Sequence, residues 1–320
     1  MLAGGVGAAR FLRGLQQAVP PQTVTAIVNT ADDMRLHGLT ICPDLDTCTY
    51  TLAEAIDPDR GWGLAGESWQ VLHALERYGE VRPTGSSAGA TWFGLGDRDL
   101  ATHLYRTQRL AEGAPLSAVT VEIARAWGVG IRLVPMSDDP VATKLTITDA
   151  GRTSEVDFQE YFVARRHDVP VSAVHFAGAA TARPAPGVLD ALATAQLIVI
   201  APSNPIVSIG PILAVPGIAD AVAARRDHTV AISPIVAGAA LKGPADRMLA
   251  ELGHERSVTG IARIYAPLAA TLVIDRADEP LAPAVAAAGM EPIVTDTVMA
   301  TLERAAALAR NVLGTIAARQ

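Results

Sequence analysis

The chain has 320 residues, a net charge of −7 and 50% apolar residues. No apolar run reaches the roughly 18–20 residues that a membrane helix needs, because the longest candidate, around Leu192–Ile200, ends before Pro202. An acidic chain without a basic cluster is also a poor match for a nucleic-acid-binding protein, whose affinity rests on contacts from Lys and Arg to phosphate. We therefore expect a globular protein that binds neither a membrane nor nucleic acid.

Cysteine usage and the first residues indicate a cytoplasmic protein. Cys42 and Cys48 are the only cysteines, and their spacing matches neither a zinc site nor a redox motif, so we expect two reduced thiols. Met1–Gly5 lacks the basic start and apolar stretch of a signal peptide. Lysine is rare: Lys144 and Lys242 stand against 24 arginines. Either a compact ammonium is needed at these positions or both are ordinary surface residues.

Short β-branched apolar runs recur along the chain, with helical patterns between several of them. We expect strands at Val24–Val28, Ile131–Val134, Ala173–Phe176, Leu197–Ile200, Val230–Ile232, Thr271–Ile274 and Pro292–Val294. The helical patterns lie at Phe11–Ala18, Gly187–Ala195, Ile218–Arg226, Ala245–Leu252 and Thr297–Ala318. This alternation predicts an α/β fold with a Rossmann-like, mostly parallel sheet and helices on both faces.

Two segments depart from the alternation. Residues 47–120 lack strand runs and carry Leu, Ala and Trp at helical spacing, which predicts a helical subdomain inserted into an α/β core of residues 1–46 and 121–320. Thr143–Thr148 and Glu155–Phe158, joined through Asp149–Gly151, indicate an antiparallel hairpin.

Gly4, Gly5 and Gly7 stand at the start of the chain and lead into the first helix. Glycines let backbone N–H groups approach a phosphate, and a helix N-terminus favours its negative charge. An ordinary strand–helix turn has the same composition, and the motif is neither a Walker loop nor a good dinucleotide fingerprint. Only Met1–Ala3 remain for the preceding strand, so either that strand is very short or the natural start lies upstream.

Four carboxylates follow within fifteen residues of one another, on loops at the expected ligand edge. Asp32 and Asp33 come directly after the second strand, and Asp44 and Asp46 alternate around Leu45, which would place both on one side of an extended segment. Such carboxylates suit a divalent cation beside a diphosphate. The alternative is that Asp46 or Thr47 caps a helix starting near Cys48, and that Asp32 and Asp33 only shape a turn.

Loops after three later strands carry further candidates. Met136, Ser137 and Asp138 could contact ligand hydroxyls or a ring, although their loop also has good turn chemistry. A second loop, stiffened by prolines, holds Ser203, Asn204 and Ser208, side chains that can read a nucleobase edge. Gly243 follows Lys242 in a loop that either binds phosphate or base or is plain surface.

Seven motifs run in register along nearly the whole chain. They are Gly4–Gly7, Asn29–Asp33, Pro43–Thr47, Gly96–Asp99, Met136–Pro140, Pro202–Pro205 with Ser208–Pro211, and Ser233-Pro234 with Gly243–Ala245. In this set the chain resembles the CofD family, also called FbiA: 2-phospho-L-lactate transferases or phosphoenolpyruvate transferases of coenzyme F-420 biosynthesis. The nearly absent first strand departs from the family pattern.

The resemblance implies a guanosine diphosphate-linked lactate or enolpyruvate donor and the deazaflavin Fo as acceptor. The ribityl hydroxyl of Fo would attack the phosphorus bearing the three-carbon acid, and GMP would leave. It further implies Mg²⁺ as the cofactor and a cytoplasmic homodimer. Which acid is transferred stays open.

The expected roles divide the candidates into four groups. Nucleotide binding falls to Gly4, Gly5, Gly7, Ser203, Asn204, Ser208 and Gly243. Deazaflavin binding falls to Asp32, Asp33, Met136, Ser137 and Asp138, with the inserted helices as an apolar wall. Asp44 and Asp46 are expected as direct or water-mediated Mg²⁺ ligands, and Asp44 and Asp33 as catalytic residues, Asp33 taking the proton of the hydroxyl.

Two other classes of protein remain as alternatives. A nucleotide-sugar-binding regulator of the YvcK type shares a similar glycine-rich and Asp-Asp start, but should lack the Gly96–Asp99 and Met136–Pro140 motifs. A nicotinamide oxidoreductase is less favoured because no acidic residue ends the second strand.

Overall fold

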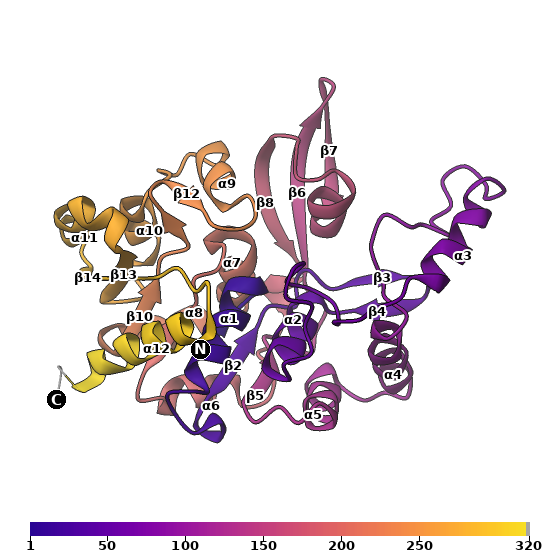
Figure 1. The fold of residues 1–320 in the computed structure, drawn as a ribbon. Helices are drawn as coiled ribbons and strands as arrows, with labels where there is room; N and C mark the ends of the chain where they lie inside the picture. Colours follow the sequence, from indigo (N-terminus) through magenta and orange to yellow (C-terminus); the bar gives the residue numbers. More distant parts are fainter. Residues whose placement is uncertain (318–320) are drawn as a thin grey trace.

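The computed structural model describes residues 1–317, and a seven-stranded parallel sheet forms its centre (Figure 1). The strands lie in the order β14–β13–β10–β9–β1–β2–β5, and every neighbouring pair is parallel. Their bounds are β1 (Leu2–Ala3), β2 (Thr25–Val28), β5 (Arg132–Pro135), β9 (Ile198–Ile200), β10 (Thr229–Ile232), β13 (Thr271–Asp275) and β14 (Glu291–Thr295). The prediction of a Rossmann-like α/β fold is confirmed.

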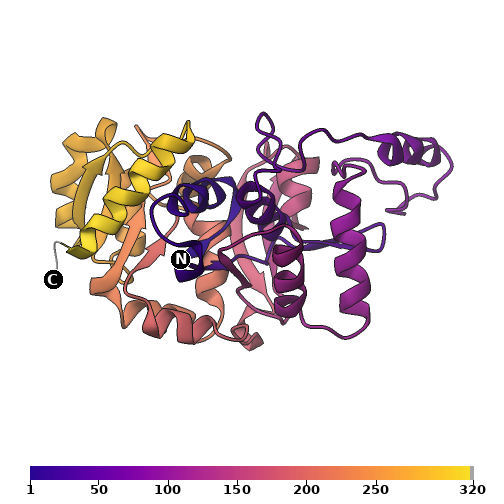
Figure 2. The same cartoon turned by 60° about the horizontal axis from the view of Figure 1, so that its bottom comes forward.

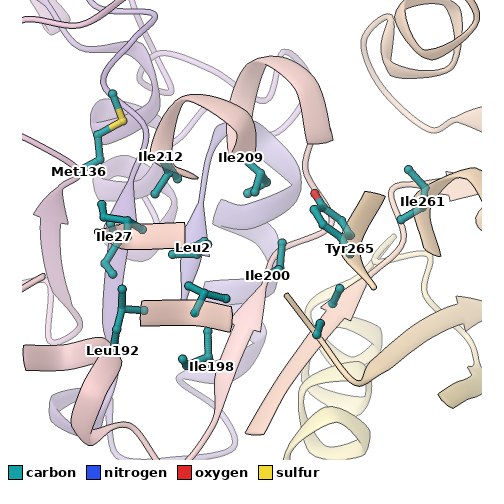
Figure 3. Close-up of a cluster of buried hydrophobic side chains, with 14 of the residues drawn as sticks. Leu2, Ile27, Met136, Leu192, Ile198, Ile200, Ile209, Ile212, Ile261 and Tyr265 are labelled. Carbon is teal, nitrogen blue, oxygen red and sulfur yellow. The ribbon is translucent and has the colours of Figure 1, made fainter. Parts of the chain in front are cut away.

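Helices cover both faces of this sheet. One face carries α1 (Gly5–Leu15), α2 (Pro43–Leu52) and α12 (Leu302–Ala317), and Figure 2 shows α12 beside α1. The other carries α6 (Val188–Thr194), α7 (Gly210–Ala214), α8 (Ile218–Ala223), α9 (Ala245–Glu251), α10 (Val258–Tyr265) and α11 (Ala282–Ala287). Figure 3 shows the core on this face, where Leu2, Ile27 and Ile200 of three neighbouring strands meet Ile209 and Ile212. Each such burial contributes about 1.5–3 kcal/mol, which explains the apolar strand runs.

A second, antiparallel sheet stands beside the first (Figure 1). The predicted hairpin is confirmed as β6 (Ala142–Asp149) and β7 (Arg152–Asp157), followed by a π-helical turn at Glu160–Ala164. The expectation that Ala173–Phe176 joins the parallel sheet is wrong: β8 (Val171–Ala177) pairs with β6 in the small sheet. Its middle residues are mostly exposed, whereas strands of a covered parallel sheet are buried on both faces.

The remaining elements extend to one side of the core (Figures 1 and 2). They are the hairpin of β3 (Met34–Leu36) and β4 (Leu39–Ile41), with α3 (Gln70–Gly79), α4 (Asp99–Ala111) and α5 (Leu116–Ala126). Within the predicted insertion, α2 packs on α1 and α5 packs on β5, while α4 packs on β4. The core–insertion boundary at residues 47–120 stays a prediction.

The Gly96–Asp99 motif connects two helix starts. Asp97 accepts hydrogen bonds from the N–H groups of Gln70 and Val71 and so caps α3. In return, Glu67 accepts from the N–H groups of the first residues of α4. A Cβ at Gly96 would lie 2.1 Å from the Glu67 carboxyl carbon, so a glycine is needed for this approach. Asp97 therefore caps α3 and not α4, the helix that follows its own motif.

The predicted C-terminal helix Thr297–Ala318 begins later, at Leu302. The N–H and hydroxyl of Thr297 donate to Asp275 at the end of β13, which holds the chain before α12 out of helical form. Ala318 lies outside the described residues. A short hairpin, β11 (Ile235–Val236) and β12 (Ala239–Ala240), precedes α9. No helix among the described residues is long and apolar enough to cross a membrane.

Candidate functional site

A cavity of about 810 Å³ opens at the carboxyl ends of the central strands. The sheet order reverses between β1 and β9, because β2 and β5 continue on one side and β10, β13 and β14 on the other. Such a reversal leaves a crevice in which α/β proteins bind ligands. The loops that follow the strands line it with Gly4–Gly7, Asp32, Pro202–Asn204 and Ser233-Pro234.

Two aromatic surfaces flank these loops. Trp62 and Phe93 come from the segment between α2 and α4, and Phe158 and Phe162 come from the end of the small sheet. The Arg60 guanidinium lies 5.1 Å from the Trp62 ring centroid and 4.9 Å from that of Trp69, which holds the first surface in place. Phe158 stacks on Phe162 with ring centroids 5.4 Å apart. The cavity is therefore polar along the strand ends and aromatic on its sides.

The glycine turn forms the start of α1 and lines the cavity with all three predicted glycines. A Cβ at Gly7 would lie 2.3 Å from the carbonyl oxygen of Pro202, so this position must be glycine for α1 to approach the loop after β9. Gly4 contacts the same region, because its carbonyl accepts a 2.6 Å hydrogen bond from the Ser203 hydroxyl. The turn and the loop after β9 thus form one packed unit.

Asp32 and Asp44 form a buried carboxylate pair beside this turn. The side-chain amide of Asn29 donates to an oxygen of each carboxylate, at 3.1 Å in both cases. Burial, and then the charge of Asp44, raises the pKa of Asp32 well above its usual range. Burial also raises the pKa of Asp44, to about 6. Neither forms an ion pair with a described residue, so the pair lacks a neutralising cation.

Asp46 lies in the same helix but is fully paired. Arg106 binds both of its carboxylate oxygens, one at 3.1 Å, and His103 Nδ1 lies 3.7 Å away. The other ring nitrogen of His103 lies 3.3 Å from Asp99, which also accepts a 2.5 Å hydrogen bond from the Tyr50 hydroxyl. Burial alone would raise the pKa of Asp99, but its contacts with His103 lower it. This network joins α2 to α4.

The prediction that Asp44 and Asp46 share one side of an extended segment is wrong. Pro43–Leu52 is helical, and residues two apart on a helix point about 200° apart, because each residue turns the helix by about 100°. Both carboxylates still line the cavity, but they meet different partners. The alternative in which Asp46 caps the helix also fails, since the N-terminus shows no side-chain cap.

Asp33 lies next to the pair in sequence but does not line the cavity. Burial raises the pKa of its carboxyl group well above the usual range, and a hydrogen bond with the Cys42 thiol opposes this shift. A carboxyl group with a raised pKa can take up a proton near neutral pH.

Residues predicted for the nucleotide all line the cavity. Asn204 caps the turn Pro205–Ile209, because its side-chain oxygen accepts from the N–H groups of Ile206 and Val207 at 2.9 and 3.4 Å. Ser208 and Gly243 also line the cavity, and a Cβ at Gly4 would be 2.8 Å from Ser208 Cβ, so Ser208 lies against the glycine turn. This loop is therefore held in shape by its own hydrogen bonds.

Comparison with known proteins gives the family. The model of the family described as 2-phospho-L-lactate transferase CofD matches residues 1–313. The chain belongs to the CofD family. A phosphoenolpyruvate transferase of Kitasatospora aureofaciens is 48% identical over 98% of this chain and 95% of its own length. One of Thermobifida fusca is 44% identical over 97% of this chain and 94% of its own length.

A solved structure of a UPF0052 family protein from Bacillus halodurans has the same fold. Its TM-score is 0.62 at 17% identity, over 98% of this chain and 97% of that one. The predicted resemblance to the CofD family is thus confirmed, and the fold is found again in a distant structure.

In this CofD family member, Met136, Ser137 and Asp138, which are predicted to bind the deazaflavin, lie outside the cavity lining, as Asp33 does. Met136 is fully buried in the core that Figure 3 shows. Ser137 donates to the carbonyl of Arg183, and Asp138 accepts from the N–H and hydroxyl of Ser117 at the start of α5. Their contacts are structural, as the turn interpretation of this loop indicates.

The structure also adds residues that motif reasoning missed. Arg10, Trp62, Gln159 and Lys242 line the cavity, together with Thr297–Ala300. The rarity of lysine pointed to Lys242, but nothing local in the sequence marked the others. They reach the cavity from elements far apart in the chain.

Proposed function

We propose that this CofD family member transfers a phosphoenolpyruvyl group from a guanosine diphosphate-linked donor to the deazaflavin Fo in coenzyme F-420 biosynthesis. The relatives of Kitasatospora and Thermobifida carry the name phosphoenolpyruvate transferase, which favours enolpyruvate over lactate. The main support for this proposal is the Asp32–Asp44 pair, whose charge no described residue neutralises. The pair lies beside the glycine turn, in the cavity where the strand order of the sheet reverses.

Mg²⁺ fits this carboxylate pair. The two buried carboxylates repel each other, and a divalent cation would remove that cost. Among the described residues no cluster of three acidic, His or Cys ligands exists, which suits Mg²⁺ because it is commonly held by one or two carboxylates with water and substrate phosphates. Asp32 and Asp44 would hold the ion, while Arg106 occupies Asp46. Bound there, Mg²⁺ would stabilise negative charge on the diphosphate.

The chain's own residues would then position the reaction. The ribityl oxygen of Fo forms a bond to the phosphorus that bears the acid, the bond from that phosphorus to the GMP oxygen breaks, and GMP leaves. The backbone of Gly4–Gly7 would face the phosphates at the start of α1. The hydroxyl proton would pass to a carboxylate, for which we propose Asp33, because it follows Asp32 directly and is not assigned to the ion as Asp32 and Asp44 are.

The acceptor side would use the aromatic surface at Trp62 and Phe93. A planar deazaflavin ring can stack on an indole, and such contacts contribute about 0.5–1.5 kcal/mol beyond area burial. We expect Trp62→Ala to weaken Fo binding about tenfold in a fluorescence titration, with GDP affinity unchanged. Tyr105→Ala is the control, because Tyr105 on α4 is similarly exposed but does not line the cavity. Asp32 would anchor the polar tail, and the Met136–Asp138 loop is left out of this proposed site.

The guanosine would occupy the region of Ser203, Asn204, Ser208 and Gly243. Because Ser203 and Asn204 already bond to the backbone, they would mainly keep this surface in shape. A surface ordered before binding lowers the entropic cost of recognition.

We also propose a homodimer that forms through α3. This helix has no buried residues, and Val71, Tyr78 and Val81 on and after it are 45%, 54% and 75% exposed. Exposed apolar side chains in such a group are typical of an interface. Light scattering should give the dimer mass for the native chain and the monomer mass when all three are changed to Ser.

The test of the proposed function is a product mass. Purified protein with Fo, enolpyruvyl donor and Mg²⁺ should give the Fo conjugate and GMP. The lactyl and enolpyruvyl products differ by two hydrogens, so one spectrum identifies the acid. Fo binding without any transfer would instead contradict the proposal, and nucleotide-sugar binding without Fo binding would favour the regulator of the YvcK type.

A further inference from the structure

Two cations that face the cavity have no acidic partner among the described residues. Arg10 on α1 and Lys242 in the loop before α9 both line it. Neither forms a hydrogen bond through its side chain or an ion pair with another described residue, whereas Arg60, the other cation on the lining, is paired with Asp57 at 2.9 Å. In a chain with net charge −7, two unpaired neighbouring cations are an unusual arrangement.

The two cations lie close enough to repel each other. Partial burial lowers the pKa of Lys242, and the charge of Arg10 lowers it further. The Lys242 ammonium and Val6, in the first turn of α1, lie near the same glycine: a Cβ at Gly61 would be 2.9 Å from Lys242 Nζ and 3.6 Å from Val6 Cγ1. Arg10 is four residues after Val6, so both face the same side of α1.

Groups of opposite charge lie near the first turn of α1. A Cβ at Gly5 would be 3.9 Å from a carboxylate oxygen of Asp44, and Lys242 and Val6 both lie near Gly61. A ligand held by a cation at the acidic pair would reach the two free cations with its remaining negative charge. The cost of holding Arg10 and Lys242 together is removed when an anion lies between them.

We infer that Arg10 and Lys242 form an anion-recognition pair that selects the donor by a negatively charged oxygen group beyond the one bound at Asp32 and Asp44. This inference rests on the proposed function. The donor offers two such groups: the phosphate of its diphosphate that the cation leaves free, and the carboxylate of its three-carbon acid. Both are bound by the same chemistry, a charge-assisted hydrogen bond from guanidinium or ammonium.

The experiment compares matched variants in the full chain. Lys242→Met and Arg10→Met should each weaken the affected ligand about tenfold or more, as expected for hydrogen bonds to charged groups. Lys144→Met is the control for Lys242→Met, because Lys144 is the other lysine of the chain and pairs with Asp157 on the small sheet. Arg13→Met is the control for Arg10, because Arg13 lies on the same helix and pairs with Glu54. Both controls should bind as the native chain does.

Binding measurements with different ligands distinguish the two possible anions, the diphosphate and the carboxylate. Weaker GDP binding in the variants assigns the pair to the diphosphate. Unchanged GDP binding with a raised KM for the enolpyruvyl donor assigns it to the carboxylate. Unchanged affinity for both ligands overturns the inference.

A second readout does not depend on turnover. With two lysines in the chain, acylation of each can be followed by peptide mass, and inorganic pyrophosphate or GDP should protect Lys242 but not Lys144. Protection of Lys242 by the enolpyruvyl donor alone assigns the pair to the carboxylate. Equal labelling of Lys242 without ligand and with GDP, pyrophosphate or the donor, in protein that binds GDP, overturns the inference while the proposed function stands. If pyrophosphate protects Lys242 but the protein transfers nothing to Fo, the anion-recognition pair is supported and the proposed function is contradicted.

Discussion

Asp44 and Asp46 are two residues apart in α2, yet one belongs to a pair without a cation and the other to a closed network. Asp44 and Asp32 share a single amide donor, Asn29. Asp46 is bound by Arg106, with His103 beside it. A buried carboxylate that already has a cation fixes the structure, whereas one that lacks it can take up a cation or a proton. Position in the motif therefore does not assign the role; the neighbours do.

The largest effect is expected when one carboxylate of the Asp32–Asp44 pair is removed. Asp44→Asn should lower kcat by about a thousandfold, because removing one anionic ligand costs several kcal/mol of the charge stabilisation that a metal supplies. Steady-state rates at saturating Mg²⁺, with circular dichroism to show the fold, measure this. Asp59→Asn, at an exposed position, is the control. Full activity in Asp44→Asn at ordinary Mg²⁺ would refute the assignment.

Breaking the network of Asp46, Arg106 and His103 should lower the stability of the fold. Arg106→Met leaves Asp46 buried and unpaired, so we expect the free energy of unfolding to fall by about 3–5 kcal/mol. Arg109→Met, one turn along α4, removes only pairs with Glu112 and Glu122 at a more exposed position and should cost about 1 kcal/mol or less. Urea denaturation measures both, and equal losses would show that burial of the Asp46 pair does not matter.

A third variant tests the proposed proton acceptor next to the Asp32–Asp44 pair. Asp33→Asn should reduce turnover about a hundredfold with Fo and GDP binding retained, within the range for loss of a general base. Asp32→Asn, which changes a proposed Mg²⁺ ligand on the cavity lining, should instead raise the Mg²⁺ concentration needed for turnover. Unchanged turnover in Asp33→Asn would remove its base role, and lost Fo affinity would make it a binding residue.

The smallest expected effect is a pH dependence of the apo protein in a chelator. The pKa of Asp44 is about 6 in the fold against the usual 3.8, so the folded state holds its proton to higher pH. The stability this contributes is complete below pH 3.8 and is lost as the pH rises through 6. The native chain should therefore lose about 1–3 kcal/mol relative to Asp44→Asn between pH 4 and 7.

Urea denaturation at each pH measures the difference, and Mg²⁺ should reduce it by neutralising the pair. A difference that grows as the pH falls would have the wrong sign for a raised pKa. A difference unaffected by Mg²⁺ would separate the pair from metal binding.

The sequence by itself determined the fold class and where the ligand-binding loops meet. Alternating apolar runs and helical patterns specify parallel strands, and parallel strands bring their carboxyl ends to one edge. Gly4, Asp32, Asp44, Asn204 and Gly243 could therefore be predicted as neighbours, and they line one cavity. Local periodicity also gave the hairpin of β6 and β7.

Only the tertiary structure decided what each side chain meets. The partner of Asp46 is 60 positions away, and Lys242 lies beside Gly61, which is far from it in the sequence. Helical form at Pro43–Leu52 turned Asp44 and Asp46 apart, and Met136 went into the core. Such outcomes depend on contacts between distant segments, and these control burial and charge neutralisation. Burial and neutralisation in turn set which carboxylates and which cations stay free for a ligand, and no local pattern encodes them.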